Sequence, residues 1–302
     1  MAHGRHLMAR AAAILATALV LTLANTGSVA ASEVAATAKQ KRTAWLWETS
    51  IWRTLPADLL DRAQALKIRS LFIALEIRDG QVRDGSQLKA FLRAAHERGI
   101  SVLAVEGDPH MVLAKGQPNA IARAQAIRAY QLGALPEEQL DGLQYDIEPY
   151  VLPRFDTSNP RHLRKWSSTY RELRRAFTRK LDIVLPFWVS DKPPGADFVR
   201  ASAASAKGLT VMAYRTKPDR IIAAAAPLLD LGVELDRPVR VALEMGPTDE
   251  GPGVSFEGDL DALLRAMRKT LPTFAAWPNF AGFAIHGIVW PGQTAGVVDK
   301  RR

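Results

Sequence analysis

The feature that most constrains the fold of this chain is a regular alternation of short apolar runs with longer amphipathic segments. Eight runs are strand candidates, because each is short, apolar and bounded by turn residues. They are Ala44 to Trp47, Ser70 to Leu75, Ser101 to Val105, Gly142 to Ile147, Asp182 to Trp188, Leu209 to Tyr214, Val239 to Leu243 and Ala281 to Ile285. Strands that alternate with helices form a parallel sheet. The sequence therefore predicts an α/β fold, a single-domain (β/α)8 TIM barrel over residues 43–292.

The segments between the strands have the apolar spacing of outer barrel helices. Ser86 is predicted to cap one helix, and Gly99 to end it. Two more apolar stripes lie within 161–180 and 260–271. Only residues 291–302 follow the last strand, so we expect an abbreviated final helix and a loose tail over 293–302.

The first 31 residues have the pattern of a secretory signal peptide: a basic start, an apolar run and small residues at the end. An uncleaved N-terminal anchor is the alternative. Residues 32–42 are expected to be a flexible segment. No second membrane segment is evident, so we predict an exported protein, periplasmic or secreted, with no integral membrane domain after signal removal.

Charge and cysteine content limit the possible partners. Without the two arginines of the signal, 38 basic and 31 acidic residues remain, a net charge of about +7, which fits a basic surface or attraction to an anionic polymer or a membrane surface. The helix expected over 161–180 is rich in arginine, but no aromatic residue interrupts its polar face, so we expect a solvated face and no nucleic-acid partner. Cysteine is absent, which excludes disulfides and thiolate sites. The sequence leaves the oligomeric state open.

The segment from Asp141 to Pro149 carries the strongest chemical signal. Side chains two residues apart on a strand share a face, so Gln144, Asp146 and Glu148 are expected to point into one pocket. Repulsion between two close carboxylates raises the pKa of one of them, and a general acid that protonates a sugar leaving group needs such a carboxyl. We therefore expect acid catalysis at this strand end.

In barrels of this type the active site lies at the carboxyl ends of the strands. Candidate residues at the other strand ends are polar or aromatic, and flat aromatic faces stack on the apolar faces of sugar rings. These candidates are Trp47, Glu48, Glu76, Glu106, Trp188, Tyr214, Arg215, Glu244, His286 and Trp290. The set predicts a cleft that binds a polysaccharide or oligosaccharide.

These residues resemble the motifs of chitinase-like family 18 glycoside hydrolases, with this chain as a divergent member. Asp141-Gly142, Asp146 and Glu148 are similar to the family's signature on the fourth strand, and Met212 and Tyr214 to its sixth-strand motif. The resemblance implies that Glu148 is the proton donor and that Asp146 orients the substrate's 2-acetamido group. It further implies that Tyr214 hydrogen-bonds that group and that Trp290 forms the floor of the site.

Two positions depart from the family pattern. Gln144 stands where these enzymes commonly carry another acid, which alters the tuning of Asp146. Arg215 replaces an acidic or amide residue and places a fixed cation near the pocket, which favours an acidic sugar.

Two alternatives use the same barrel. Glu148 as acid/base with Glu244 as nucleophile resembles the pair of retaining glycosidases that use strands four and seven. A non-catalytic carbohydrate-binding barrel is the alternative from another class. No paired histidine spacing or phosphate loop is present, so we expect neither a metal nor a cofactor.

Overall fold

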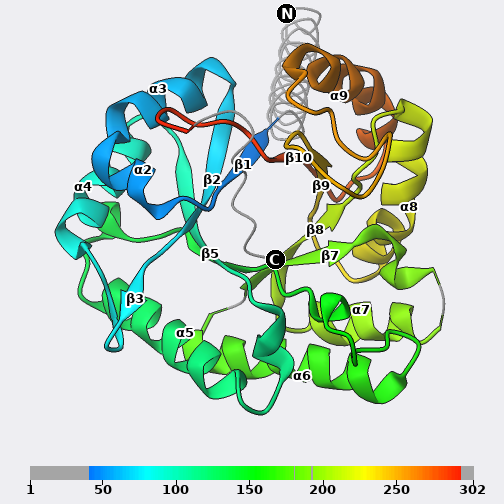
Figure 1. Ribbon diagram of the computed structural model, residues 1–302, viewed down its shortest axis with the longest axis horizontal. Coiled ribbons are helices and arrows are strands. Elements are labelled where there is room, and N and C mark those ends of the chain that lie inside the picture. Colours follow the sequence, from blue (N-terminus) through cyan, green and yellow to red (C-terminus); the bar gives the residue numbers. More distant parts are fainter. Residues whose placement is uncertain (1–40, 180, 192, 294–302) are drawn as a thin grey trace, which may run out of the picture. The chain divides into compact units, whose positions relative to one another are not determined.

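The computed structural model describes residues 41–179, 181–191 and 193–293, and they form a closed barrel of parallel strands (Figure 1). The barrel order is β1, β2, β5, β6, β7, β8, β9 and β10, with β10 closing on β1. Their bounds are β1 Arg42–Leu46, β2 Ile68–Ala74, β5 Ser101–Glu106, β6 Gly142–Tyr145, β7 Leu181–Pro186, β8 Ala206–Met212, β9 Val239–Glu244 and β10 Phe280–His286. All eight predicted strands are present, and the predicted (β/α)8 TIM barrel is confirmed.

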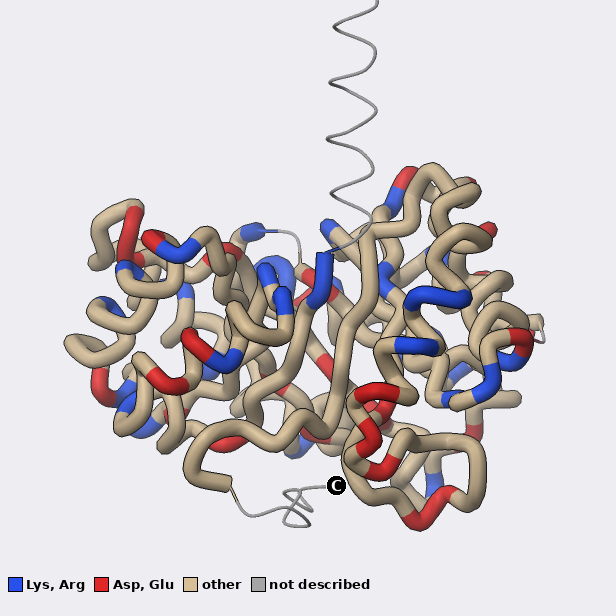
Figure 2. The backbone as a smooth tube through the Cα atoms, turned by 90° about the horizontal axis from the view of Figure 1, so that it is seen from above, with Lys and Arg blue, Asp and Glu red and all other residues tan. Residues whose placement is uncertain are grey.

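Helices surround the barrel and cover its outer face (Figure 1). The α-helices are α2 Thr49–Thr54, α3 Pro56–Ala65, α4 Gly85–Glu97, α5 Gln117–Leu132, α6 Pro160–Phe177, α7 Gly195–Ala203, α8 Pro218–Glu234 and α9 Leu260–Phe274. Short 3-10 turns lie in the connecting loops: η1 Pro109–Val112, η2 Pro136–Glu138, η3 Pro149–Val151 and η4 Phe187–Ser190. Lys, Arg, Asp and Glu are interspersed along the outer helices (Figure 2).

Helix α6 shows how the apolar stripe fixes each helix against the barrel. Leu163, Trp166, Tyr170 and Leu173 are buried at steps of three and four residues. The arginines between them are exposed, as expected for a face that meets solvent. Outer helices of this kind hold the strands in place without reaching the barrel interior.

The helix predicted to begin at Ser86 begins one residue earlier, at Gly85, with Asp84 in the N-cap position. Ser86 is therefore not the cap. The Asp84 side chain makes no capping bond and instead pairs with Arg53 at 2.6 Å. The predicted end is correct, since Gly99 follows the helix with a φ of +67°, a conformation that favours glycine.

A two-stranded hairpin between β2 and α4 was missing from the predicted elements. It pairs β3 (Ile77–Arg78) with β4 (Gln81–Val82). Asp79 and Gly80 form its turn, both with positive φ. An Asp-Gly turn between short strands is a hairpin signal, so the sequence does contain the information.

The predicted terminal segments fall largely outside the described residues. The signal over 1–31 lies there, as do most of the segment 32–42 and nearly all of the tail. Arg42 already belongs to β1, and the described residues after β10, 287–293, contain no helix. Among the helices of the described ranges, none is long and apolar enough to span a membrane.

The barrel interior is filled by a separate apolar cluster drawn from strands alone. It comprises Trp45, Phe72, Leu103, Val105, Val184, Met212, Ala242 and Ala284. Near the amino ends of the strands, Asp182 and Arg240 form an ion pair at 2.5 Å, with the guanidinium 5.6 Å from the Phe72 ring centroid. The pair closes this end of the interior with a charge-assisted bond, because Asp182 is only 5% exposed.

Removal of one partner of that pair should be costly. We expect Asp182→Ala to lower the free energy of unfolding by about 2–4 kcal/mol, because Arg240 is left as a partly buried charge without its carboxylate. Urea unfolding monitored by circular dichroism measures the loss. The control is Asp197→Ala, which breaks an exposed pair with Arg200 and should change stability by less than about 1 kcal/mol. Equal losses in the two variants would contradict the prediction.

Candidate active site

Polar and aromatic side chains gather at the carboxyl ends of the barrel strands, which we call the mouth. Along each strand, residues that point inward alternate with residues that meet the helices. Ala242 and Ala284 belong to the interior cluster, so Glu244 and His286, two residues further on, also point inward at the mouth. The same count gives Trp47 after Trp45 and Tyr214 after Met212. Asp146 and Glu148 follow β6, and the charges of both raise the pKa of His286, so they also lie at the mouth.

Gln144 lies one level below the mouth and is completely buried. Its Oε1 accepts a hydrogen bond from Trp45 Nε1 at 2.8 Å, and its Nε2 lies 3.4 Å from Thr210 Oγ1. An amide can satisfy both groups inside the barrel, since it offers an acceptor and a donor. The prediction that Gln144 contacts a substrate is therefore wrong, because a side chain with 0% exposure offers no surface. Gln144 instead forms the floor beneath the two carboxylates.

Glu244 and His286 form the best-defined contact at the mouth. His286 Nδ1 lies 2.6 Å from Glu244 Oε2, and Gly246 N donates to Glu244 Oε1 at 2.7 Å. Both carboxylate oxygens are thus occupied, and the Glu244 side chain is 4% exposed. Gly287 makes the arrangement possible: its φ is +70°, and a Cβ there would lie 2.4 Å from Glu244 Oε1. Any larger residue at 287 would displace the carboxylate.

The two groups shift each other's pKa. Burial raises the pKa of Glu244, but the charge of His286 and the hydrogen bonds from His286 and Gly246 outweigh it, and the pKa of Glu244 falls below its ordinary value. Burial lowers the pKa of His286, but the carboxylate of Glu244, and beyond it those of Asp146 and Glu148, raise it overall. When His286 is protonated, its charge and that of the Glu244 carboxylate therefore stabilise each other in this partly buried site.

Aromatic rings surround His286. Trp47 Nε1 donates to His286 Nε2 at 3.0 Å, the Tyr214 ring is stacked at a centroid distance of 6.2 Å, and Trp45 meets the imidazole edge-on at 5.8 Å. Trp47 and Tyr214 are half-buried and pack against the interior cluster. The mouth thus combines acidic groups with partly exposed ring faces.

Tyr150 is a site residue that the predicted set omits. It lies in η3, directly after Glu148, and contacts the Trp188 ring edge-on at 5.0 Å. Burial, then the charges of Glu148 and Asp146, raise its pKa. This places the phenol beside both carboxylates, together with Trp188. The sequence could have indicated this, because Tyr150 lies only two residues after Glu148.

Glu106 does not point into the mouth, because it follows the outward alternation of β5 after Ala104. Arg123 of α5 binds Glu106 through Nε at 2.6 Å and Nη2 at 2.8 Å, and Glu106 is 4% exposed. Glu48 caps α2 by accepting from Ser50 N. The prediction that Glu106 binds substrate is therefore wrong, because its buried carboxylate joins β5 to α5. Glu48 is half-buried, and its contact with a substrate stays a prediction.

Glu76 and Arg215 are also engaged elsewhere. Glu76 pairs with Arg53 at 2.9 Å and Arg78 at 2.6 Å. Arg215 donates to the Tyr214 carbonyl at 2.7 Å, and its guanidinium lies 4.4 Å from the Phe187 ring centroid. Arg215 therefore supports the Tyr214 backbone, and the expectation that it places a cation near the pocket stays a prediction.

Trp290 does not form a floor. It is 2% exposed, and its Nε1 donates to the Trp45 carbonyl at 2.9 Å. Its ring belongs to the core between barrel and helices. The expectation of Trp290 as a sugar platform is therefore wrong, because the ring offers almost no exposed face.

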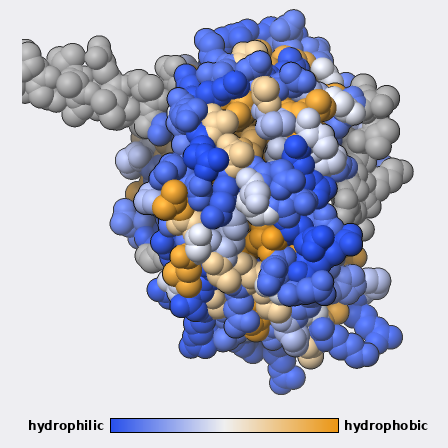
Figure 3. All heavy atoms as spheres, turned by 90° about the vertical axis from the view of Figure 1, so that its left-hand side faces the viewer, coloured by the Kyte–Doolittle hydropathy of each residue, from blue (hydrophilic) through white to orange (hydrophobic). Residues whose placement is uncertain are grey.

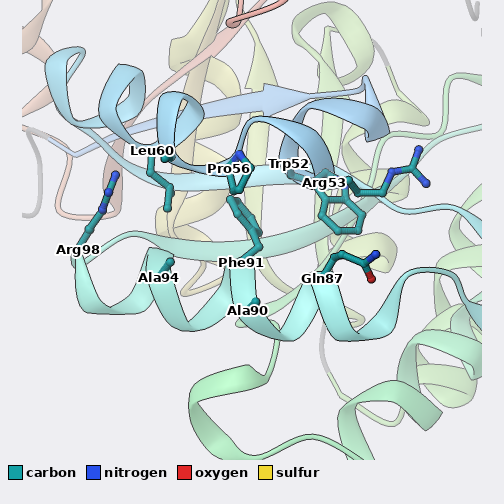
Figure 4. Close-up of a pocket in the computed structure, with 10 residues that line it drawn as sticks. Trp52, Arg53, Pro56, Leu60, Gln87, Ala90, Phe91, Ala94 and Arg98 are labelled. Carbon is teal, nitrogen blue, oxygen red and sulfur yellow. The ribbon is translucent and has the colours of Figure 1, made fainter.

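A groove of about 270 Å³ lies away from the mouth, between α2–α3 and α4 (Figure 4). Its apolar wall includes Leu60, Phe91 and Ala94, and the surrounding surface is mainly hydrophilic with separate hydrophobic spots (Figure 3). Arg53 and Arg98 at its edge already pair with carboxylates. The groove therefore lacks the chemistry found at the mouth. Within the part of the chain that the structure describes, no group of three or more His, Asp or Glu is placed to hold a metal ion.

Comparison with solved structures shows the same fold in known glycosidases. A family 18 chitinase from Pseudoalteromonas aurantia superposes with a TM-score of 0.56 at 11% identity, covering 82% of this chain and 94% of the chitinase. An endo-beta-N-acetylglucosaminidase from Cordyceps militaris gives 0.52 at 15% identity, covering 89% of each chain. A family 113 beta-1,4-mannanase gives 0.50 at 13% identity, covering 82% of this chain and 87% of the mannanase. No protein-family model and no curated protein sequence matches the chain. The similarity is one of fold.

The Glu244–His286 pair predicts a distinct pH dependence of stability. The raised pKa of His286 contributes stability that is complete below its ordinary value of 6.5 and is lost as pH rises through the raised value. The lowered pKa of Glu244 contributes stability that is present above 4.5 and is lost as pH falls through the lowered value. Urea unfolding at several pH values should therefore show the largest difference between wild type and Glu244→Gln at pH 4.5–6.5, decreasing above it.

Glu234→Gln serves as the control for that series. Glu234 pairs with Arg200, whose charge persists throughout this range, so the corresponding difference should stay flat between about pH 6 and 9. A Glu244→Gln difference that grows with pH would contradict the assignment.

Proposed function

We propose that the protein is a glycoside hydrolase that acts on a polysaccharide containing 2-acetamido sugars, with Glu148 as general acid. The observation that supports the proposal is that Asp146 and Glu148, both half-buried, follow β6 and act on His286 at a mouth lined by partly exposed aromatic rings. The shared fold of chitinases and N-acetylglucosaminidases supports it. Export through residues 1–31 belongs to the same proposal and rests on the sequence pattern alone.

In the proposed reaction the substrate supplies its own nucleophile. Glu148 gives its proton to the glycosidic oxygen while the bond from that oxygen to the anomeric carbon breaks. The carbonyl oxygen of the 2-acetamido group bonds to the anomeric carbon, Asp146 accepts a hydrogen bond from the acetamido N–H, and the Tyr214 hydroxyl donates to the carbonyl. Water then attacks the anomeric carbon, gives a proton to Glu148 and restores the acetamido group.

The geometry of Glu244 favours this scheme over a two-carboxylate double displacement. A nucleophile must direct an oxygen lone pair at the anomeric carbon. Glu244 is buried, and its two oxygens accept from His286 and Gly246. Its role in the proposal is therefore to hold His286. The retaining alternative, with Glu244 as nucleophile, requires that these bonds break.

The first test replaces the proposed acid. We expect Glu148→Gln to lower kcat for hydrolysis of an N-acetylglucosamine hexasaccharide by roughly 10²- to 10⁴-fold, because the amide cannot donate a proton to the leaving group. Glu234→Gln, far from the mouth, should keep wild-type activity and shows that loss of a surface carboxylate alone has no effect. A Glu148→Gln enzyme as fast as wild type would disprove the proposal. Wild-type binding without turnover would establish the carbohydrate-binding alternative.

The second test removes the proposed nucleophile from the substrate. An oligosaccharide that carries free 2-amino groups lacks the acetamido carbonyl, so its hydrolysis should be slower than that of the N-acetylated oligomer by at least about 10²-fold, the scale expected when an oriented intramolecular group is lost. Product analysis by chromatography measures both rates. Equal rates, combined with a large loss in Glu244→Gln, would favour the retaining alternative.

A further inference from the structure

Three residues from three strand ends form a continuous hydrogen-bonded chain at the mouth. Trp47 Nε1 follows β1 and lies 3.0 Å from His286 Nε2 at the end of β10, and His286 Nδ1 lies 2.6 Å from Glu244 Oε2 at the end of β9. Gly246 N anchors the other oxygen of Glu244 at 2.7 Å. The chain therefore runs from a fixed backbone amide to the edge of a partly exposed indole.

The chemistry of the three groups sets the direction of the hydrogen bonds. An indole N–H donates and cannot accept, so His286 Nε2 must present a lone pair to Trp47. Nδ1 then carries the hydrogen and donates it to the Glu244 carboxylate. The contact with Trp47 thus exists only while His286 is neutral, in the tautomer with its hydrogen on Nδ1.

We propose that Glu244 and His286 are positioning residues that hold the Trp47 indole as the stacking platform for a pyranose ring at the mouth. The proposal rests on the proposed function. It assigns to Trp47 the sugar-stacking role that the sequence had suggested for Trp290. Trp47 is half-buried and packs on the interior cluster, while Trp290 is 2% exposed. A stacking ring must be both exposed and held in orientation, and the hydrogen-bonded chain provides the second condition.

Protonation of His286 should release the platform. An imidazolium has hydrogens on both nitrogens, so Nε2 can no longer accept from Trp47. The groups that face His286 are Glu244 from β9, Asp146 and Glu148 after β6, and the rings of Tyr214 and Trp45. The three carboxylates favour the imidazolium and the Trp47 bond opposes it, so the Trp47 contact is coupled to the protonation state of His286.

The experiment uses the full chain with Glu148→Gln, in which turnover should be slow, and an N-acetylglucosamine hexasaccharide as probe. In this background we expect about fivefold weaker binding at pH 5.5 than at pH 8.5, the scale of one lost neutral hydrogen bond. His286→Gln keeps an acceptor for Trp47 and a donor for Glu244 without titrating, so its binding should match the pH 8.5 value at both pH values. His286→Leu keeps neither and should bind about fivefold to tenfold more weakly at both.

A direct readout does not depend on the sugar. The indole N–H resonance of Trp47, assigned by its loss in Trp47→Phe, should shift with pH along the titration of His286 and should be pH-independent in His286→Gln. Trp277→Phe is the matched control, because Trp277 Nε1 donates to Asp230 at 2.8 Å on the outside of the barrel. That variant should keep both the pH-dependent binding and the Trp47 resonance.

The possible failures are distinguishable. Two results would overturn the proposed link between Glu244, His286 and Trp47 while leaving the proposed function intact. One is equal binding by His286→Leu and His286→Gln, and the other is a Trp47 resonance that does not change as His286 titrates. Absence of binding to the hexasaccharide by every variant would overturn the proposed function and the platform together, and the indole resonance would still decide whether Trp47, His286 and Glu244 are linked.

Discussion

Closure of eight strands into a barrel is the constraint on which the rest of this structure depends. In a closed barrel of eight strands, the inward-pointing side chains pack in layers. Each inward position therefore belongs to one layer and has fixed neighbours. An apolar cluster fills the interior together with polar residues that include Gln144, Thr210 and the Asp182–Arg240 pair. The polar residues of the mouth pack against this filled interior, so their side chains cannot move further into the barrel.

The surroundings of the mouth explain why its groups are strongly coupled. A carboxylate that is buried without a partner is costly, so Glu244 is held by an imidazole and a backbone amide. The same low-polarity surroundings strengthen the interaction of His286 with Asp146 and Glu148. A change in the charge of one of these groups therefore alters the pKa of the others.

The sequence predicted the barrel well, because apolar runs and helical stripes are local patterns with a clear period. It predicted the site less well, because all strand-end carboxylates look alike in one dimension. Glu106 was included although Val105, its neighbour, is the inward residue, and strict use of the alternation would have excluded it. Its partner Arg123 lies on α5, and no local pattern predicts that contact. The position of Trp290 was predicted wrongly for a different reason. Trp290 lies four residues after the end of β10, where the inward and outward alternation of strand side chains no longer applies.

The contacts of Glu244 also limit which mechanisms this mouth can host. If Glu244 acted as a nucleophile, Oε2 would have to leave His286 Nδ1 and turn toward the sugar, and His286 would lose the acceptor that fixes its tautomer. The Trp47 indole, which depends on that tautomer, would lose its anchor at the step in which the sugar must be held most firmly. In the proposed mechanism, in which the substrate supplies the nucleophile, Glu244, His286 and Trp47 would keep one arrangement throughout the reaction, and this conflict would not arise.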